Sequence, residues 1–204
     1  MKNVVIIGTG GHAKVVADIV LSSKDHLLGF LTSDTGIKSF MGWPVLGRDT
    51  EYEPFLQHQF VVAIGNAVAR ERIVSSMNQA NAKWYTAIHP SAMVSAVHST
   101  IGEGSVVMPY AVINPCAQIG AHCIVNSNAT VEHDNQIGDF VHISVGAKLA
   151  GTVVIGRRTW VGVGAAVRDK VRICQDCMIG AGAVVVKNIE VPGIYVGVPA
   201  RRVK

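Results

Sequence analysis

An aliphatic residue stands at every sixth position in the second half of the chain, without interruption from residue 101 to residue 191. Neither the period of about 3.6 of an amphipathic helix nor the period of about 2 of a strand keeps one residue class in register over that distance. The six-residue period therefore predicts a solenoid of short parallel strands whose aliphatic side chains point inward. These positions are Ile101, Val107, Ile113, Ile119, Val125, Val131, Ile137, Ile143, Leu149, Ile155, Val161, Val167, Ile173, Ile179, Val185 and Val191.

A second column of the repeat, two residues before each aliphatic position, holds mostly small side chains and is expected to face inward as well. Glycine directly follows the aliphatic residue at several positions, mostly eighteen residues apart, which suggests coils of three hexapeptides with one tighter corner each. The small residues are Ser105, Ala111, Ala117, Cys123, Ala129, Ala147, Thr159, Ala165, Cys177 and Ala183. The glycines are Gly102, Gly120, Gly138, Gly156 and Gly180.

The first 88 residues alternate between strand-like apolar runs and helical patterns. Residues 3–7 predict a buried strand that runs into a glycine turn and a helix, with Val15, Val16, Ile19 and Val20 on one face. Further strands are expected at 26–31, 44–47, 60–64 and 84–88, and a second helix at 67–80. The alternation predicts a small Rossmann-like parallel α/β domain over residues 1–88. The repeat then predicts a β-helix over 89–192, followed by a tail at 193–204.

Composition narrows the class of protein further. With 49% hydrophobic and 16% charged residues among 204, the chain is typical of a globular protein, and no apolar run reaches the ~18 residues of a membrane span. The first residues form a strand and a glycine turn, not a signal peptide, so a cytoplasmic location and no membrane contact are expected. From residue 140 onward ten Lys and Arg face three acids, which suits a polyanionic small molecule or simply a solvated surface. No basic run with interleaved aromatics predicts nucleic-acid binding.

The four cysteines include one CxxC pair, Cys174 and Cys177. Cys123 and Cys177 occupy the small inward column 54 residues apart, which is three coils or roughly 14 Å, too far for a disulfide. They are therefore predicted to be packing residues, with Cys116 and Cys174 as free thiols without chemistry. No two of the eight His are five residues apart, as the zinc carbonic anhydrases built on such a prism require, so no metal site is expected.

The glycine turn Gly8-Thr9-Gly10-Gly11-His12 is a candidate phosphate site, because backbone N–H groups at a helix start point toward a bound anion. The pattern is GxGxxx and not the full GxGxxG, so it is weak by itself. Asp34 follows the second strand, where a ribose-binding acid would lie. Gly65 and Asn66 follow the third strand and are expected to line the same crevice.

His133 is the strongest catalytic candidate, since it follows an inward aliphatic residue by two positions and is itself followed by Asp134. One coil later comes Gly151, whose backbone would lie roughly 5 Å from that of His133 with no side chain to block approach. A base beside an open backbone donor suits acyl transfer. His142 lies half a coil from His133, so the two can meet only across a subunit contact. A closed threefold oligomer of prisms would supply that contact.

The chain resembles the bacterial sugar acyltransferases that join a small nucleotide-sugar-binding α/β domain to a left-handed parallel β-helix. The resemblance covers essentially the whole chain and is carried by IIGTGGHAKVVADI, AIGNAVARERI, AIHPSAMVS, GSVVMPYAVINPCAQIG, NSNATVEHDNQIGDFVHISVGAKLAGTVVIG and the ending VGVPARR. It is strongest to N-acetyltransferases of UDP-4-amino-4,6-dideoxy sugars in the bacillosamine pathway and to sialic acid O-acetyltransferases. It implies a homotrimer that binds acetyl-CoA between neighbouring subunits.

The resemblance also implies roles for individual residues. His133 would be the general base and Asp134 the acid that orients it, although the relatives considered carry Glu there. Acetyl-CoA would contact Gly151, Arg201 and, from the adjacent subunit, His142. The substrate would contact Asn126 and, through its nucleotide, Gly10, Gly11 and His12. The relatives usually have an Asp pair after the second strand where this chain has Thr32-Ser33-Asp34, which leaves recognition of uracil open.

The resulting hypothesis is an acetyl-CoA-dependent N-acetyltransferase that acts directly on the 4-amino group of a nucleotide-linked 4-amino-4,6-dideoxy sugar. The alternative within the same family is O-acetylation of sialic acid or a similar sugar hydroxyl, since one His could serve either acceptor. A dehydrogenase would need about twice the α/β region seen here. A non-catalytic sensor of nucleotide sugars remains open and predicts binding without thiol release.

Overall fold

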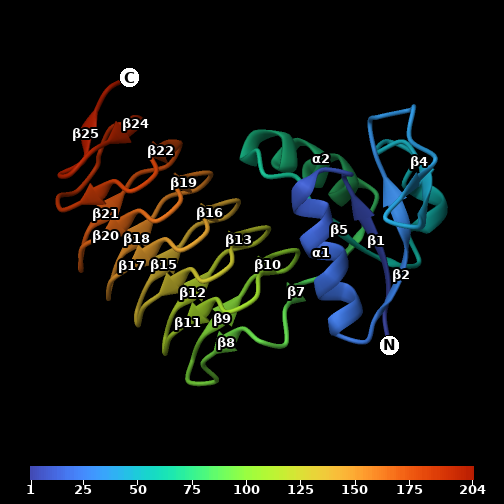
Figure 1. Ribbon diagram of the computed structural model, residues 1–204, viewed down its shortest axis with the longest axis horizontal. Coiled ribbons are helices and arrows are strands. Elements are labelled where there is room, and N and C mark those ends of the chain that lie inside the picture. Colours follow the sequence, from blue (N-terminus) through green and yellow to red (C-terminus); the bar gives the residue numbers. More distant parts are fainter. The chain divides into compact units, whose positions relative to one another are not determined.

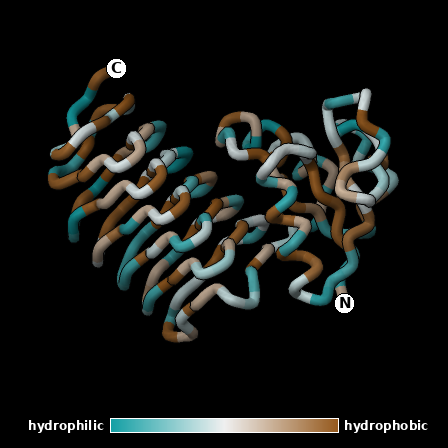
Figure 2. The backbone as a smooth tube through the Cα atoms, in the orientation of Figure 1, coloured by the Kyte–Doolittle hydropathy of each residue, from teal (hydrophilic) through white to brown (hydrophobic).

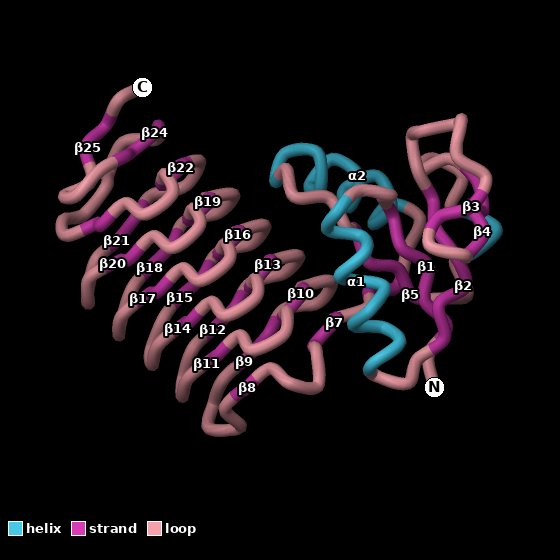
Figure 3. The backbone as a smooth tube through the Cα atoms, viewed as in Figure 1, coloured by secondary structure: helices cyan, strands magenta, loops and turns pink.

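The computed structural model describes residues 1–204, which divide into two compact units, Met1–Pro90 and Ser91–Lys204. The first unit is built on a six-stranded sheet of strand order β3-β4-β2-β1-β5-β6, with helices α1 and α2 (Figures 1 and 3). Its elements are β1 Asn3–Ile7, α1 Gly11–Ser22, β2 His26–Leu31, β3 Ser39–Phe40, β4 Trp43–Gly47, the 3-10 turn η1 Glu53–Phe55, β5 Gln59–Val62, α2 Ala67–Gln79, β6 Lys83–Trp84 and β7 Ala87–Ile88.

The expected strand, glycine turn and helix at the start of the chain are present. β1 lies between β2 and β5 and is parallel to both, and its residues from Val4 to Ile7 are fully buried. On α1, Val16, Ile19 and Val20 are buried as the helical pattern predicts, while Val15 is only partly buried. The carboxyl end of β1 and the amino end of α1 thus meet at the glycine turn.

Two expectations for the first unit need correction. The sheet is mixed and not purely parallel, because β3 pairs antiparallel with β4. Only two residues join them, Met41 and Gly42, both with positive φ, and such a link is too short for the crossover that a parallel pair needs. The strand expected at 84–88 is in fact two short strands, β6 and β7.

The second unit is a parallel β-solenoid, which confirms the interpretation of the six-residue period (Figure 1). Successive coils pair eighteen residues apart, as Val106 with Ile124 and Ile124 with His142. Face A holds β10 Val106–Val107, β13 Ile124–Val125, β16 His142–Ile143, β19 Trp160–Val161, β22 Cys177–Ile179 and the end hairpin β24 Gly193–Val196 with β25 Arg201–Arg202. Face B holds β8 Met93–Val94, β11 Val112–Ile113, β14 Thr130–Val131, β17 Lys148–Leu149, β20 Ala166–Val167 and β23 Val184–Val185. Face C holds β9 Thr100–Ile101, β12 Gln118–Ile119, β15 Gln136–Ile137, β18 Val154–Ile155 and β21 Arg172–Ile173.

Both predicted inward columns form the core of the solenoid. From Val107 to Val185 every aliphatic position is buried, and every residue of the small column is buried beside it. Figure 2 shows the same hydrophobic segments returning in coil after coil. The prediction fails at the last position, because Val191 is 52% exposed. Ile189 takes the inward place instead and bridges Ile173, so the final coil is two residues shorter than the period requires.

The corners of the solenoid are not made by the glycines that the sequence suggested. The left-handed residue of each corner lies three positions after the aliphatic residue and is usually not glycine, as His122, Asp134 and Thr152 show. Gly120 and Gly138 instead allow close packing of coils. A Cβ at Gly138 would lie 2.8 Å from the backbone nitrogen of Arg157 in the next coil. The glycine column is therefore set by the spacing between coils and not by backbone dihedrals.

Candidate functional site

His133 lies at the corner between faces B and C, directly after β14. Its Nδ1 is 2.7 Å from Oδ2 of Asp134, and both side chains are more than half exposed. Asp134 is the left-handed residue of that corner, with φ of 59°, a conformation that Asp tolerates better than most residues. The backbone N–H of Asp134 donates to Pro115 in the coil before, and the His133 carbonyl accepts from Thr152 in the coil after. The pair is therefore held between two neighbouring coils.

The contact with Asp134 decides which nitrogen of His133 can act as a base. An ionised carboxylate only accepts hydrogen bonds, so in the neutral imidazole the proton lies on Nδ1. The lone pair of Nε2 is then free to accept a proton. The carboxylate also stabilises the imidazolium that forms when it does so.

Gly151 lies directly beside the free nitrogen of His133. A Cβ built on Gly151 would be 2.5 Å from Nε2 and 2.6 Å from Cε1 of His133, closer than any real side chain could come. The Gly151 N–H donates to no group of the chain, although its carbonyl accepts from Lys170. Only glycine therefore leaves room for the imidazole ring, and a free backbone donor lies beside the base.

One residue of this corner was missed at the sequence level. Asn135 is fully buried in the column that elsewhere holds mostly small side chains. Its Nδ2 donates to the carbonyls of Glu132 at 2.8 Å and Ala150 at 3.1 Å, and its Oδ1 accepts from Val153 at 2.6 Å. These bonds join the backbone on either side of His133 to the coil that carries Gly151. The signal was present in the sequence, since an amide interrupts a column of small residues.

Replacing Asn135 with alanine is expected to lower the free energy of unfolding by about 1–3 kcal/mol, because a buried N–H and two carbonyls lose their partner. Urea unfolding followed by circular dichroism measures the change. The neighbouring Gln136 is exposed, and Gln136→Ala should change stability by no more than about 0.5 kcal/mol. Equal stability of the two variants would show that the Asn135 network does not hold the coils together.

A second polar cluster lies on face A and at its corner toward face B. Asn126 donates from Nδ2 to Nε2 of His142 at 3.1 Å. The His142 ring stacks on Trp160, with ring centroids 5.0 Å apart, and Trp160 in turn donates to the hydroxyl of Ser144. Within one chain, Asn126 and His142 are thus in contact with each other, and β14 separates them from His133.

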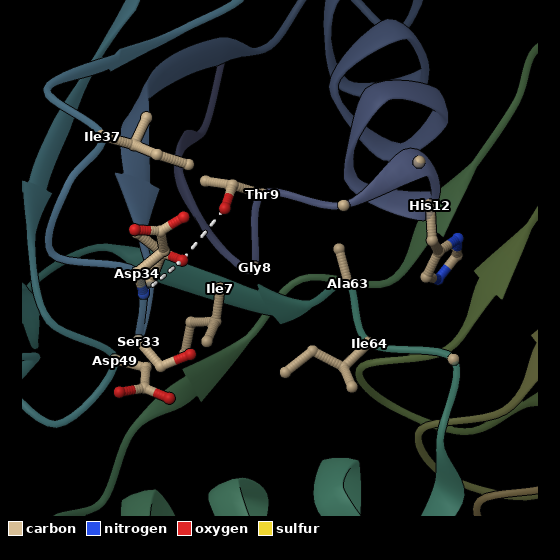
Figure 4. A pocket seen from close by; sticks show the side chains of 14 residues that line it. Ile7, Gly8, Thr9, His12, Ser33, Asp34, Ile37, Asp49, Ala63 and Ile64 are labelled. Carbon is tan, nitrogen blue, oxygen red and sulfur yellow. Dashed lines mark hydrogen bonds between the residues drawn. The ribbon is translucent and has the colours of Figure 1, made fainter.

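The glycine turn lines a pocket of about 540 Å³ in the first unit (Figure 4). Gly10 is the N-cap of α1 and provides no side-chain hydrogen bond, so the first N–H groups of the helix have no cap. A Cβ at Gly10 or Gly11 would meet nothing within 4 Å, which leaves the backbone accessible. Uncapped N–H groups and the helix dipole make this end of the pocket suited to an anion such as a phosphate.

His12 stands at the same end of the pocket, and its Nε2 is buried without a hydrogen-bond partner. Burial, and to a smaller extent the charge of Arg70, lowers the pKa of His12 to about 4. The imidazole is therefore neutral near pH 7 and can offer an N–H. Arg70 is itself buried and donates to the carbonyls of Ile64 at 2.7 Å and Gly65 at 3.0 Å, which holds the loop after β5.

Two carboxylates, Asp34 and Asp49, lie with Ser33 at the other end of the pocket (Figure 4). Oδ1 of Asp34 accepts from the Gly36 N–H at 3.0 Å, and no cation pairs with either carboxylate. This end therefore suits a group rich in O–H or N–H donors. Sequence reasoning found Asp34 and missed Asp49, which comes from the loop after β4.

Gly65 lines the pocket as expected, but Asn66 does not. The Asn66 side chain accepts from the N–H of Ala69 at 2.9 Å and caps α2. An N-cap of this kind is a common structural use of Asn. The structure thus assigns Asn66 a helix-capping contact in place of the expected contact with the crevice.

Arg201 lines a separate pocket of about 320 Å³ at the C-terminal end of the solenoid, together with Lys187 and Arg202. Tyr195 and Asn188 complete its polar wall. Three cationic side chains in one pocket suit a phosphorylated ligand. No group of three or more His, Cys, Asp or Glu side chains is placed to hold a metal ion, and neither helix is long and apolar enough to span a membrane.

Comparison with protein families matches residues 3–77 to the PglD N-terminal domain, and residues 98–133 and 152–187 to the bacterial transferase hexapeptide repeat. The chain is 38% identical over 115 residues to UDP-N-acetylbacillosamine N-acetyltransferase of Bacillus subtilis (strain 168), covering 53% of this chain and 52% of that protein. It is 31% identical over 138 residues to GDP-perosamine N-acetyltransferase of Escherichia coli O157:H7, covering 64% and 62%. The matched segments thus span between half and two thirds of these relatives.

Solved structures match over nearly the full chain. The acetyltransferase domain of PglB from Neisseria gonorrhoeae FA1090 is 36% identical, with a TM-score of 0.94 and 100% of both chains covered. PerB from Caulobacter crescentus, solved with CoA and GDP-perosamine, is 36% identical with a TM-score of 0.93, covering 99% of this chain and 97% of that one. A variant of the Caulobacter protein with one His changed to Asn also binds both molecules.

Fold and site together define a hexapeptide-repeat transferase with an N-terminal α/β domain. The full-length likeness goes further and confirms the resemblance found in the sequence. The chain belongs to the PglD-type family of sugar N-acetyltransferases with hexapeptide repeats. The relatives named above are N-acetyltransferases of UDP-N-acetylbacillosamine and GDP-perosamine, and solved relatives hold acetyl-CoA, or CoA with GDP-perosamine.

Proposed function

We propose that the protein transfers an acetyl group from acetyl-CoA to the 4-amino group of a nucleotide-linked 4-amino-4,6-dideoxy sugar, with His133 as the general base. The observation that carries this proposal is the free Nε2 of His133 beside the open backbone of Gly151. The relatives named above act on such sugars, and several are solved with CoA or acetyl-CoA.

Transfer proceeds directly within a complex of both substrates. As the sugar nitrogen attacks the thioester carbonyl, Nε2 of His133 takes the proton that the nitrogen releases, and Asp134 stabilises the imidazolium. The free N–H of Gly151 donates to the thioester as negative charge develops. The C–S bond then breaks, and the CoA sulfur leaves as a thiolate that takes up a proton. No acyl-enzyme forms, so no nucleophilic side chain is needed.

The pocket of the first unit holds the nucleotide in this proposal. Gly10, Gly11 and His12 bind the phosphates at the amino end of α1, supported by the uncapped helix and the neutral imidazole. Asp34 accepts from a ribose hydroxyl or a base N–H at the opposite end. Gly65 leaves the wall of the pocket open because it carries no side chain.

Acetyl-CoA binds along the solenoid, and its phosphates reach the cationic pocket of Arg201, Lys187 and Arg202. His142 completes the site from the adjacent subunit. Because Asn126 is hydrogen-bonded to His142, the two residues enter the neighbour's site together. Within one chain they lie across β14 from His133, so only an assembly can combine all three.

A homotrimer is the assembly that we propose. Apolar side chains are exposed in two columns of face A and its adjoining corner, Trp160 with Met178 and Val145 with Val163. A contiguous exposed apolar surface of this kind is typical of a buried interface. In the proposed threefold assembly, face A of one copy lies toward the B–C corner of the next.

Placing a charge in this surface is expected to dissociate the trimer. Val163 is 55% exposed in the single chain, so Val163→Asp should fold normally but carry an unpaired carboxylate into the interface. Size-exclusion chromatography with light scattering should show a trimer mass for the unaltered protein and a monomer mass for this variant. Val68→Asp, at an exposed site on α2, should remain trimeric. A monomeric unaltered protein would disprove the proposed assembly.

Release of the CoA thiol tests the activity. The acceptors are UDP-, dTDP- and GDP-linked 4-amino-4,6-dideoxy sugars, and free and CMP-linked sialic acid. We expect saturable release with one of the amino sugars. Release only with a sialic acid would move the assignment to O-acetylation. Binding of a nucleotide sugar without release for any acceptor would indicate a sensor.

A further inference from the structure

Two of the four cysteines lie in direct contact. The Sγ atoms of Cys174 and Cys177 are 3.4 Å apart at the corner between β21 and β22, and both residues are reduced. The spacing of three coils excludes a bond between Cys177 and Cys123, but it does not bear on Cys174, which lies three positions from Cys177 at the same corner. The two thiols of the CxxC sequence are therefore a pair, and not one packing residue and one isolated thiol.

The position of Cys174 in the repeat shows why this corner can hold a thiol pair. Cys174 occupies the column of Gly120, Gly138 and Gly156, in which a Cβ would press against the backbone of the next coil. The coil that follows Cys174 is two residues shorter than the others, and in it Ile189 forms a bridge with Ile173. A side chain is thus tolerated here. In the earlier coils glycine stands at the position of Cys174, so that only the small inward residue has a side chain there, as Cys123 does beside Gly120.

The backbone around the two thiols is well held by hydrogen bonds. Thr159 Oγ1 donates to the Cys174 carbonyl at 2.9 Å and accepts from the Cys177 N–H at 3.2 Å. The Cys174 N–H donates to the Ile189 carbonyl at 2.8 Å. Between them Asp176 is left-handed and receives two hydrogen bonds from Arg158, at 2.6 and 2.7 Å. The backbone that carries the two thiols is therefore fixed at this corner.

The two thiols differ in access to solvent, and the pKa of the buried one is raised. Cys177 is buried in the core, whereas Cys174 is partly exposed. Burial first, and then the hydrogen bond to Cys174, raises the pKa of the Cys177 thiol to about 12. Cys177 thus stays protonated near neutral pH, and Cys174 is the thiol that a reagent in solution meets. This is the division between an attacking and a resolving cysteine.

We propose that Cys174 and Cys177 form a reversible intrachain disulfide by exchange with a low-molecular-weight disulfide such as oxidised glutathione. The Cys174 thiolate attacks one sulfur of the reagent, which releases one thiolate and leaves a mixed disulfide on Cys174. Cys177 then loses its proton to water and attacks the Cys174 sulfur, which releases the second thiolate. The reagent disulfide is reduced to two thiols, and the two protein thiols are oxidised to one disulfide.

The disulfide closes the corner next to the C-terminal hairpin. β22 begins at Cys177 and pairs with β24, which leads to β25 and Arg201. Cys177 Sγ also lies 3.9 Å from the Val191 carbonyl, in the segment that connects to this hairpin. The site is distinct from His133 and does not depend on the proposed function.

The experiment exposes the folded full-length protein to oxidised glutathione, stops exchange with acid, and then alkylates in denaturant. We expect the number of free thiols to fall from four to two, with a mass loss of two hydrogen atoms and a peptide linking Cys174 to Cys177. Dithiothreitol should restore all four. Circular dichroism before and after establishes that the chain stays folded.

Three variants test the order of events. Cys177→Ser should stop at the mixed disulfide and gain one glutathione on Cys174. Cys174→Ser should remain unreacted at Cys177, because that thiol is buried. Cys123→Ser, altered in the same column three coils away, should still form the disulfide. The proposal is wrong if the unaltered folded protein keeps both thiols, ends as a glutathione adduct, or links a different pair.

Discussion

Replacing His133 with alanine is expected to lower turnover by about 10² to 10⁴-fold, because general-base catalysis is lost while the backbone donor of Gly151 remains. Affinity for the nucleotide sugar should change little, since the pocket proposed for the nucleotide is lined only by residues of the first unit, between Ile7 and Gly65. Stability should also be preserved, because the His133 side chain is more than half exposed. Release of CoA measures turnover, and calorimetry with a nucleotide sugar measures binding.

His58→Ala serves as the matched control, since His58 lies outside the site and should have unchanged turnover. Asp134→Asn should fall between the unaltered protein and His133→Ala, because Asn keeps the left-handed corner but no longer stabilises the imidazolium. If His133→Ala turns over as fast as the unaltered protein, His133 is not the base. Lost binding of the nucleotide sugar would instead indicate a structural role.

The second large effect is expected at a residue with no side chain. In Gly151→Ala the new methyl group would lie 2.5 Å from Nε2 of His133, so the imidazole ring must move. Displacement of a catalytic group by about 1 Å can cost about 10²-fold in rate, and we expect a loss of that order with intact nucleotide-sugar binding. The measurement is CoA release under saturating acetyl-CoA, together with urea unfolding.

Asp169 provides the control for this prediction, because it holds the same place in the repeat one coil later and is exposed. Asp169→Ala should leave turnover within about twofold if only the ring contact matters. Equal turnover in Gly151→Ala would mean that the ring of His133 need not lie over this glycine. The reactive position of Nε2 would then have to be assigned elsewhere.

The sequence predicted the solenoid because its period is carried by residue class alone. Val107 to Val185 recur every six residues, and each is buried as that recurrence requires. The α/β unit was predicted nearly as well, since the strands and helices of a small parallel layer have distinct periodicities. The errors lie where chain length overrides the pattern. The two-residue link between β3 and β4 makes an antiparallel edge, and the shortened last coil puts Ile189 in the place expected for Val191.

The glycine column shows a different limit of sequence reasoning. Glycine every eighteen residues suggested strained corners, but the strain lies at other positions, such as Asp134 and Phe140. Coil spacing explains the glycines, because a Cβ at Gly120 would lie 2.7 Å from the backbone nitrogen of Asp139. A steric conflict with the next coil favours glycine at this position of the repeat. The glycine alone does not tell whether close packing between coils or a left-handed backbone required it.

The sequence by itself determined the repeat, the order of the two units and the closeness of His133 to Gly151, because each depends only on residue class and a fixed period. The tertiary structure decided what depends on side-chain direction. It directs Nδ1 of His133 to Asp134, uses Asn66 as a helix cap, joins Asn126 to His142, buries Asn135 across two coils and brings the thiols of Cys174 and Cys177 together. A period places residues on a coil, but only the packed fold sets the rotamers that bring their polar atoms into contact.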